Sequence, residues 1–114
     1  MDTHQLSLEI NQLHADICGA LADPNRILIL YSLSEKPHTV SELSSALNIS
    51  QPATSRHLKI LRDSGLVSAT RYGANVEYRL NDSRLIEALD ILRAVLRDSL
   101  ARRAQIMSES QAEA

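Results

Sequence analysis

Residues 50–67 have the sequence SQPATSRHLKILRDSGLV, and this stretch decides the fold. Ser50 can cap a helix, and Pro52 is tolerated in the first turn because the N–H that it lacks has no helical partner there. Three side chains of the helix share one face and should pack inward: Thr54, Leu58 and Leu61. Gly65 suits a left-handed stop, and an apolar strand begins at Leu66. The pattern predicts a short amphipathic helix that leads directly into a β-strand.

The opposite face of this helix is polar and cationic. Its side chains are those of Gln51, Pro52, Ser55, Arg56, Lys59 and Arg62. Amide and guanidinium groups can pair with base edges, and cationic groups can meet phosphates. Any solvated helix can carry such residues, so an ordinary solvent-facing surface remains an alternative. The chemistry of this face suits contact with DNA and offers little for catalysis.

Helical patterns fill the chain before Ser50. Apolar residues recur at steps of three and four over residues 6–21, which predicts a helix there. Asp23-Pro24 indicates an N-cap and a first-turn proline, so a second helix should run to about Ser34. Lys36-Pro37 ends that helix, and Thr39-Val40-Ser41-Glu42 fits a capping box that starts a short third helix.

A hairpin and a long helix are expected after Gly65. Residues 66–71 and 76–80 have strand patterns, joined by Tyr72-Gly73-Ala74-Asn75 as the tip. A final helix should run over about 84–103, with an apolar stripe too wide for one small domain to cover. The expected fold class is mainly α with a small β-hairpin, in the order α-α-α-α-β-β-α.

The composition predicts one domain with an aliphatic core. The chain has 114 residues, of which 44% are apolar and only 3% aromatic, so the core must consist of Leu, Ile, Val and Ala. Small cores of this kind often gain stability by oligomerisation. One cysteine permits no intrachain disulfide, and no signal peptide or membrane-length apolar run is visible. We expect a cytoplasmic protein without a membrane partner.

The charge is unevenly distributed along the chain. The net charge is −2, which is unusual for a protein that binds nucleic acid. Residues 51–79, however, hold five basic and two acidic side chains, a local charge of +3 against −5 for the rest. A local basic face is what attracts phosphates, so the distribution favours a nucleic-acid partner.

Three linked stretches match, in order, the motifs of one protein family. They are residues 20–30 (ALADPNRILIL), residues 50–61 (SQPATSRHLKIL), and Gly65-Leu66-Val67 with Arg71, Gly73 and Tyr78-Arg79-Leu80. These resemble the start of the second helix, the recognition helix and the wing of the ArsR/SmtB family of bacterial repressors. The resemblance covers roughly residues 16–81 and implies a winged helix-turn-helix fold. It also implies a homodimer whose interface the first and last helices form.

On this resemblance, residues 1–114 form a single winged helix-turn-helix domain. Residues 1–22 and 82–104 are the expected dimerisation helices, 39–63 the helix-turn-helix and 66–80 the wing, with a frayed tail at 105–114.

The implied function is sequence-specific transcriptional regulation by a dimeric repressor on a roughly palindromic double-stranded DNA operator. Gln51 could pair with adenine and Arg56 with guanine, with Pro52 and Ser55 beside them, while Lys59 and Arg62 would meet phosphates. Arg71 and Asn75 flank the wing tip and could touch the backbone or the minor groove. The resemblance supports Gln51, Ser55 and Arg56 most directly.

Many members of the family sense metals, but this sequence departs from both familiar sites. The two thiolate positions at the start of the third helix hold Thr39 and Ser41, and hydroxyls cannot replace thiolates for a soft ion. The other site needs histidine on the last helix, and residues 84–103 contain none. Sensing by a pair of cysteines within one chain is excluded because there is one cysteine. No cofactor is therefore predicted, and the effector is unassigned.

A weak set of metal ligands remains on the first helix. His14 and Cys18 lie four residues apart and can face one direction, and His4 lies on the approach. With ligands from a partner chain, they could hold zinc, copper or nickel. The simpler interpretation makes Cys18 a small buried apolar residue and His14 a surface histidine.

Two other classes of function are less well supported by the residues. A winged helix used only for protein–protein contact would be favoured by an acidic recognition face, and the face here is basic. An enzyme would need a glycine-rich phosphate loop, a metal-ligand triad or a nucleophile beside a base, and none is visible. We therefore expect a protein that is not an enzyme.

Overall fold

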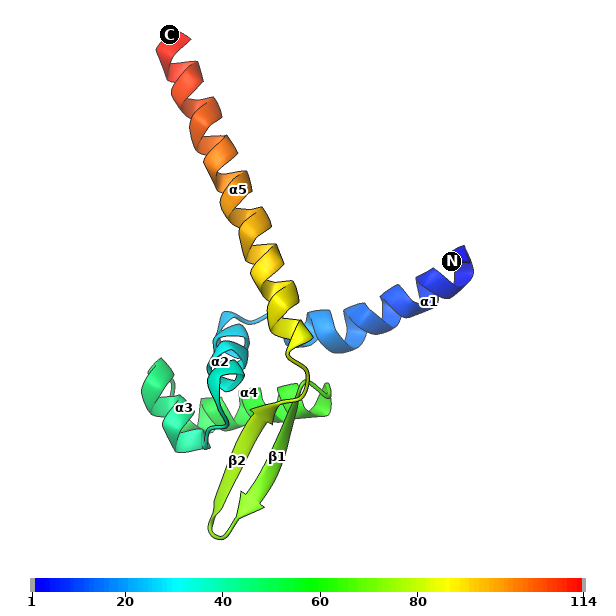
Figure 1. Ribbon diagram of the computed structural model, residues 1–114, viewed down its shortest axis with the longest axis vertical. Helices are drawn as coiled ribbons and strands as arrows, with labels where there is room; N and C mark the ends of the chain where they lie inside the picture. The colour runs from blue at the N-terminus through cyan, green and yellow to red at the C-terminus, as the bar shows by residue number, and fades with distance from the viewer. Residues whose placement is uncertain (1, 114) are drawn as a thin grey trace. The chain divides into compact units, whose positions relative to one another are not determined.

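Figure 1 shows the fold in a computed structural model that describes residues 2–113. The elements are, in order, α1 (Thr3–Leu13), η1 (His14–Cys18), α2 (Pro24–Glu35), α3 (Val40–Leu47), α4 (Gln51–Asp63), β1 (Val67–Tyr72), β2 (Asn75–Leu80) and α5 (Arg84–Glu113). The chain divides into two compact units, Met1–Asp82 and Ser83–Ala114. The expected class, mainly α with one antiparallel hairpin, is confirmed. Across residues 2–113, no helix has the combined length and apolarity to cross a bilayer.

The core of the first unit lies among α2, α3, α4 and the hairpin. Its buried aliphatic side chains include Ile29, Leu30, Leu33, Leu43, Leu58, Leu61 and Val67. Thr54 is also buried, and its hydroxyl donates a hydrogen bond to the Ser50 carbonyl oxygen at 2.9 Å. That bond lets the hydroxyl enter the core without an unpaired donor. The predicted inward face of α4 is thus confirmed.

Caps and one left-handed residue set the turn between α3 and α4. Thr39 and Glu42 form the predicted capping box, in which each side chain accepts a hydrogen bond from the backbone N–H of the other. Asn48 ends α3 with φ of 54°, a conformation that asparagine tolerates better than most residues. Ser50 then caps α4 by accepting from the Ala53 N–H at 3.2 Å.

The wing is an antiparallel hairpin whose register runs from Val67 opposite Leu80 to Tyr72 opposite Asn75. Gly65 has φ of 79°, which is the predicted left-handed stop after α4. His38 adds a bridge that the sequence did not indicate. Its N–H donates to the Tyr78 carbonyl oxygen at 3.0 Å, and its carbonyl oxygen accepts from the Tyr78 N–H at 2.8 Å. The bridge ties the segment before α3 to the wing.

The first helix differs from the expected helix over 6–21. It begins at Thr3, because Asp2 caps it, and its α-helical part ends at Leu13. Residues 14–18 form a π-helical turn, in which the Gly19 N–H donates to the carbonyl oxygen of His14, five residues back. No residue of α1 is buried, and four of its apolar side chains are exposed: Leu6, Leu8, Ile10 and Leu13.

The last helix, which forms the second unit, is longer than expected. The tail expected to fray over 105–114 is helical up to Glu113. The reason is local: residues 104–113 contain no glycine or proline and are rich in good helix formers. The Gln105 amide also donates to the Glu109 carboxylate at 3.2 Å across one helical turn. Exposed apolar side chains along α5 include Ile91, Leu92, Val95, Leu96, Leu100, Ile106 and Met107.

Candidate nucleic-acid interface

The polar face of α4 lies on the surface of the first unit. All six side chains singled out on this helix are exposed: Gln51, Pro52, Ser55, Arg56, Lys59 and Arg62. The other side of the helix is anchored by Thr54, Leu58 and Leu61, each without exposed surface. A rigidly packed helix therefore presents an amide, a hydroxyl and three cations to solvent.

Gln51 is held by a neighbour from the preceding helix. Its amide nitrogen donates to the hydroxyl of Ser41, on α3, at 3.2 Å. This bond fixes which way the amide points and leaves its carbonyl oxygen as a free acceptor. Pairing with Ser41 was not foreseen from the sequence, because the two residues lie on different helices.

The cations of α4 differ in their partners. Lys59 pairs with Asp63 at 2.9 Å, but both side chains are more than half exposed, so the pair contributes only about 0–1 kcal/mol. A phosphate could displace that carboxylate at little cost. Within residues 2–113, no ion pair engages Arg56 or Arg62. Both guanidinium groups are thus available to an anionic or base-edge partner.

The wing places further polar groups at its tip. Arg71 and Asn75 are exposed, on opposite strands next to the turn, and the tip extends away from the helices of this unit (Figure 1). Tyr72 follows Arg71 and is 58% exposed. From the sequence, this tyrosine was expected only as part of the turn. Its position beside the exposed arginine adds a hydrogen-bonding group to the same tip.

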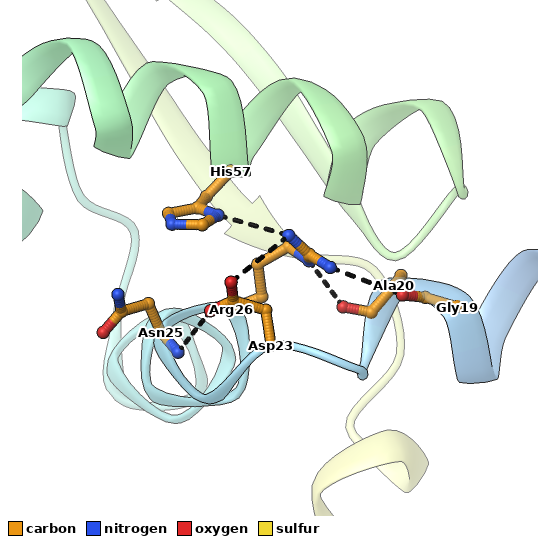
Figure 2. A network of polar contacts seen from close by, with 6 residues as sticks. All are labelled: Gly19, Ala20, Asp23, Asn25, Arg26 and His57. Atoms are coloured by element: carbon orange, nitrogen blue, oxygen red, sulfur yellow. Dashed lines mark hydrogen bonds and ion pairs between the residues drawn. The ribbon is translucent and has the colours of Figure 1, made fainter.

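His57, on α4, has a polar neighbour on another helix. It is half-buried, and its Nδ1 lies 3.3 Å from Nη1 of Arg26 on α2 (Figure 2). The two residues lie 31 positions apart in the chain. Local periodicity could not have indicated this contact.

The hydroxyls at the family's two thiolate positions have structural partners. Thr39 belongs to the capping box of α3, and Ser41 accepts the bond from Gln51. The Thr39 N–H and hydroxyl, in that order, lower the pKa of the exposed Glu42 carboxyl from its ordinary value of 4.5. These groups therefore fix the start of α3 and the orientation of Gln51.

The weak ligand set on the first helix lies on the surface. His4, His14 and Cys18 are all exposed in the chain, so the interpretation of Cys18 as a buried apolar residue is wrong for this chain. The reason is that Cys18 lies on η1, which continues α1 directly and, among the described elements of its unit, contacts no other helix or strand. Within the described part of the chain, no three His, Cys, Asp or Glu side chains gather in a way that could hold a metal ion.

Comparison with known proteins gives the family. A family model described as "Bacterial regulatory protein, arsR family" matches residues 23–69. The HTH-type transcriptional repressor SmtB of Mycobacterium tuberculosis is 44% identical over 77 residues, which are 68% of this chain and 57% of that repressor. The chain thus spans less than two thirds of the length of this relative.

Solved structures agree in fold. The crystal structure of M. tuberculosis Rv0081 matches with a TM-score of 0.74 and 33% identity, covering 83% of this chain and 96% of that one. The homodimeric winged helix-turn-helix DNA-binding domain of Mb0332 from Mycobacterium bovis matches with a TM-score of 0.72 and 25% identity, over 88% of this chain and 91% of that one. The family model, the SmtB repressor and the Mb0332 domain are described as regulators or DNA-binding domains rather than enzymes. The motif order, the winged helix-turn-helix fold and these similarities together establish that the chain belongs to the ArsR family of bacterial regulatory proteins.

Proposed function

We propose that the protein is a sequence-specific DNA-binding transcriptional repressor that acts as a homodimer. The observation that carries the proposal is the exposed face of α4, where Gln51, Ser55 and Arg56 are presented by a helix whose other face is fully buried. A rigid helix of this kind can enter a major groove and read base edges. The named SmtB repressor and the Mb0332 DNA-binding domain support the same function.

Each exposed group has a role that follows from its chemistry. The free guanidinium of Arg56 suits the two acceptors of guanine, and the amide of Gln51 suits adenine. Pro52 and Ser55 lie beside them, at the end of α4 that faces the bases. Lys59 and Arg62 would meet phosphates and set the register without reading sequence. Arg71 and Asn75 at the wing tip would contact the adjacent backbone or minor groove.

Dimerisation would cover the apolar surfaces that the single chain leaves exposed. Leu6, Ile10, Leu13 and Ile17 line an open groove of about 490 Å³ along α1 and η1. The exposed leucines and isoleucines of α5 form a second apolar surface. Exposed apolar surfaces that several neighbouring side chains form are typical of interaction sites, and each leucine fully buried there would contribute about 1.5–3 kcal/mol. The second copy of this chain is the proposed occupant of both.

The proposed repressor needs no cofactor to bind DNA, and we place it in the cytoplasm, where its operator would lie. The engaged hydroxyls of Thr39 and Ser41 support the absence of the family's thiolate site. Metal binding by His14 and Cys18, with ligands from the second copy, stays the weaker alternative. Titration of the purified dimer with zinc, copper and nickel in a competition assay with a chromogenic chelator tests it.

A mobility-shift assay tests the main proposal. The full chain is titrated into the DNA upstream of its own gene and into a scrambled duplex of equal length, at two salt concentrations. We expect tight binding to the first duplex, weaker binding to the second, and loss of affinity at high salt for both. Equal binding to both duplexes would contradict sequence-specific repression, and no binding to either would favour a winged helix that contacts only proteins.

A further inference from the structure

Arg26 joins parts of the first unit that are distant in sequence (Figure 2). Its Nε donates to the carbonyl oxygen of Ala20 at 2.7 Å, and its Nη2 donates to that of Gly19 at 3.4 Å. Its Nη1 lies 3.3 Å from Nδ1 of His57 on α4 and 3.8 Å from the carboxylate of Asp23. The Arg26 side chain is only 13% exposed. One guanidinium therefore links the chain just after η1, the start of α2 and α4.

The contact between Arg26 and His57 requires a neutral imidazole. A guanidinium has only donors, so Nδ1 of His57 must be the acceptor and the ring proton must lie on Nε2. A protonated ring carries an N–H on both nitrogens and would direct a donor and a positive charge at the guanidinium. In this poorly hydrated position, such repulsion would separate the two side chains.

Few other charged groups face His57. On α2 the facing groups are Arg26 itself and, behind it, the N-cap carboxylate of Asp23. The Asp23 carboxylate also accepts from the Asn25 N–H at 2.8 Å, so it is fixed at the start of α2. The segment after η1 contributes backbone carbonyls, and on α4 itself the neighbouring charges, Arg56 and Lys59, are exposed. A proton added to His57 would therefore lie next to the positive charge of Arg26.

His57 is placed where its position affects the DNA-facing side chains. It follows Arg56 directly and precedes Leu58, whose side chain is fully buried. Thr54, Leu58 and Leu61 already hold α4 in the core, so the contact with Arg26 is not needed to keep the helix folded. It instead links one edge of α4, next to Arg56, to α2 and to the chain just after η1.

We infer that Arg26 and His57 are positioning residues, which hold α4 in the orientation that reads the operator only while His57 is neutral. The inference rests on the proposed DNA-binding function and deepens it. Acidification should therefore reduce discrimination between operator and other DNA. The added positive charge on α4 would, in contrast, strengthen the attraction of any duplex through its phosphates. Loss of positioning therefore lowers the affinity for the operator relative to that for the scrambled duplex, whereas a general loss of binding would lower both affinities.

The experiment measures the ratio of operator to scrambled-duplex affinity between pH 8 and pH 5.5, at constant salt. We expect the wild-type ratio to fall about tenfold, as for loss of one hydrogen bond to a charged group. His57→Asn places its Oδ1 as far from Cβ as the Nδ1 of histidine, so it keeps an acceptor for the guanidinium but cannot ionise, and its ratio should be high and independent of pH. Arg26→Met removes the donor, so its ratio should be low at every pH.

Control variants assign the response to this contact. His38 is the other half-buried histidine and lies 3.9 Å from Glu42, and His14 is exposed. His38→Gln and His14→Gln should both retain the wild-type pH profile. Thermal unfolding of every variant at pH 8 reports whether it is folded. His57→Leu has a similar volume but no acceptor, so its ratio should be low at every pH.

The outcomes distinguish the inference from the function on which it rests. If the wild type binds the operator and His57→Asn has the same pH profile, the positioning role is overturned and the repressor function is left intact. A pH response lost in His38→Gln but kept in His57→Asn would overturn the positioning role equally. Absence of specific binding by the wild type at pH 8 would overturn both proposals.

Discussion

Arg56→Ala should reduce operator affinity without affecting the fold. The Arg56 side chain is exposed, and within residues 2–113 no ion pair engages it. Its removal therefore breaks no ion pair of the folded chain, and the free energy of unfolding should change by less than about 0.5 kcal/mol. The same lack of a partner means that the guanidinium can approach a base without first being released from a carboxylate.

The magnitude follows from one base contact in each half of the operator. A bidentate contact between arginine and guanine contributes about 1–3 kcal/mol of discrimination against the wrong base. Two distant contacts in a dimer should add, which gives a loss of about 2–6 kcal/mol on a symmetric operator. On an operator with guanine replaced in both halves, the variant and the wild type should bind alike.

Fluorescence anisotropy with labelled duplexes measures these differences. Lys36→Ala, at the end of α2, removes the same charge outside the proposed DNA contacts and outside the expected dimerisation helices, and serves as the matched control. We expect the control to bind both duplexes like the wild type. If Arg56→Ala binds the intact operator as tightly as the wild type, the assignment of Arg56 to a base contact is wrong.

Three further predictions concern phosphate contact, the core and pH. Lys59→Ala should weaken binding to operator and scrambled DNA alike. In salt titrations, the slope of log affinity against log salt should fall by about 0.9 for each phosphate that the lysine neutralises. Weakening confined to one of the two duplexes would contradict this role. Leu61→Ala should lower the free energy of unfolding by about 2–5 kcal/mol in urea denaturation, because Leu61 is fully buried, and a change below about 1 kcal/mol would contradict that packing. Because Thr39 lowers the pKa of Glu42 in the folded chain, the stabilisation from this carboxylate should be present above its ordinary pKa and disappear as the pH falls through the lowered value. Melting temperatures between pH 6 and pH 3 should therefore decline more for the wild type than for Glu42→Gln, and parallel curves would refute the linkage.

Local signals in the sequence predicted the fold best. The caps at Thr39 and Ser50, the inward face of α4 and the stop at Gly65 each depend on a few neighbouring residues, and the structure has all of them. The hairpin follows from alternation and from turn residues in the same way. These features were sufficient to place the exposed face of α4 and the wing.

Contacts between distant segments could not be predicted from one sequence. The bond from Gln51 to Ser41, the bridge between His38 and Tyr78, and the contact of Arg26 with His57 each join different elements. No periodicity specifies such pairs. The π-helical turn was also missed, because the two steps of four from Leu13 to Ile17 and Leu21 fit an α-helical face as well as a wider turn.

Polarity was a poor guide to the end of α5. The tail was expected to fray because it is small and polar, yet the helix continues to Glu113. Helix propensity, rather than burial, governs such a segment, since alanine, glutamine and glutamate all favour the helix. No residue pattern in the sequence indicated an effector. The two positions where the family's metal-binding thiolates would lie hold Thr39 and Ser41, whose hydroxyls contact Glu42 and Gln51 instead.

Hydroxyl-radical footprinting of the operator, combined with sedimentation of the complex, tests the central claim most directly. Two exposed α4 faces on one dimer should protect two segments on one side of the duplex, about 10–10.5 base pairs apart, with two chains per duplex. A single protected segment bound by one chain, or an unprotected duplex, would contradict the account.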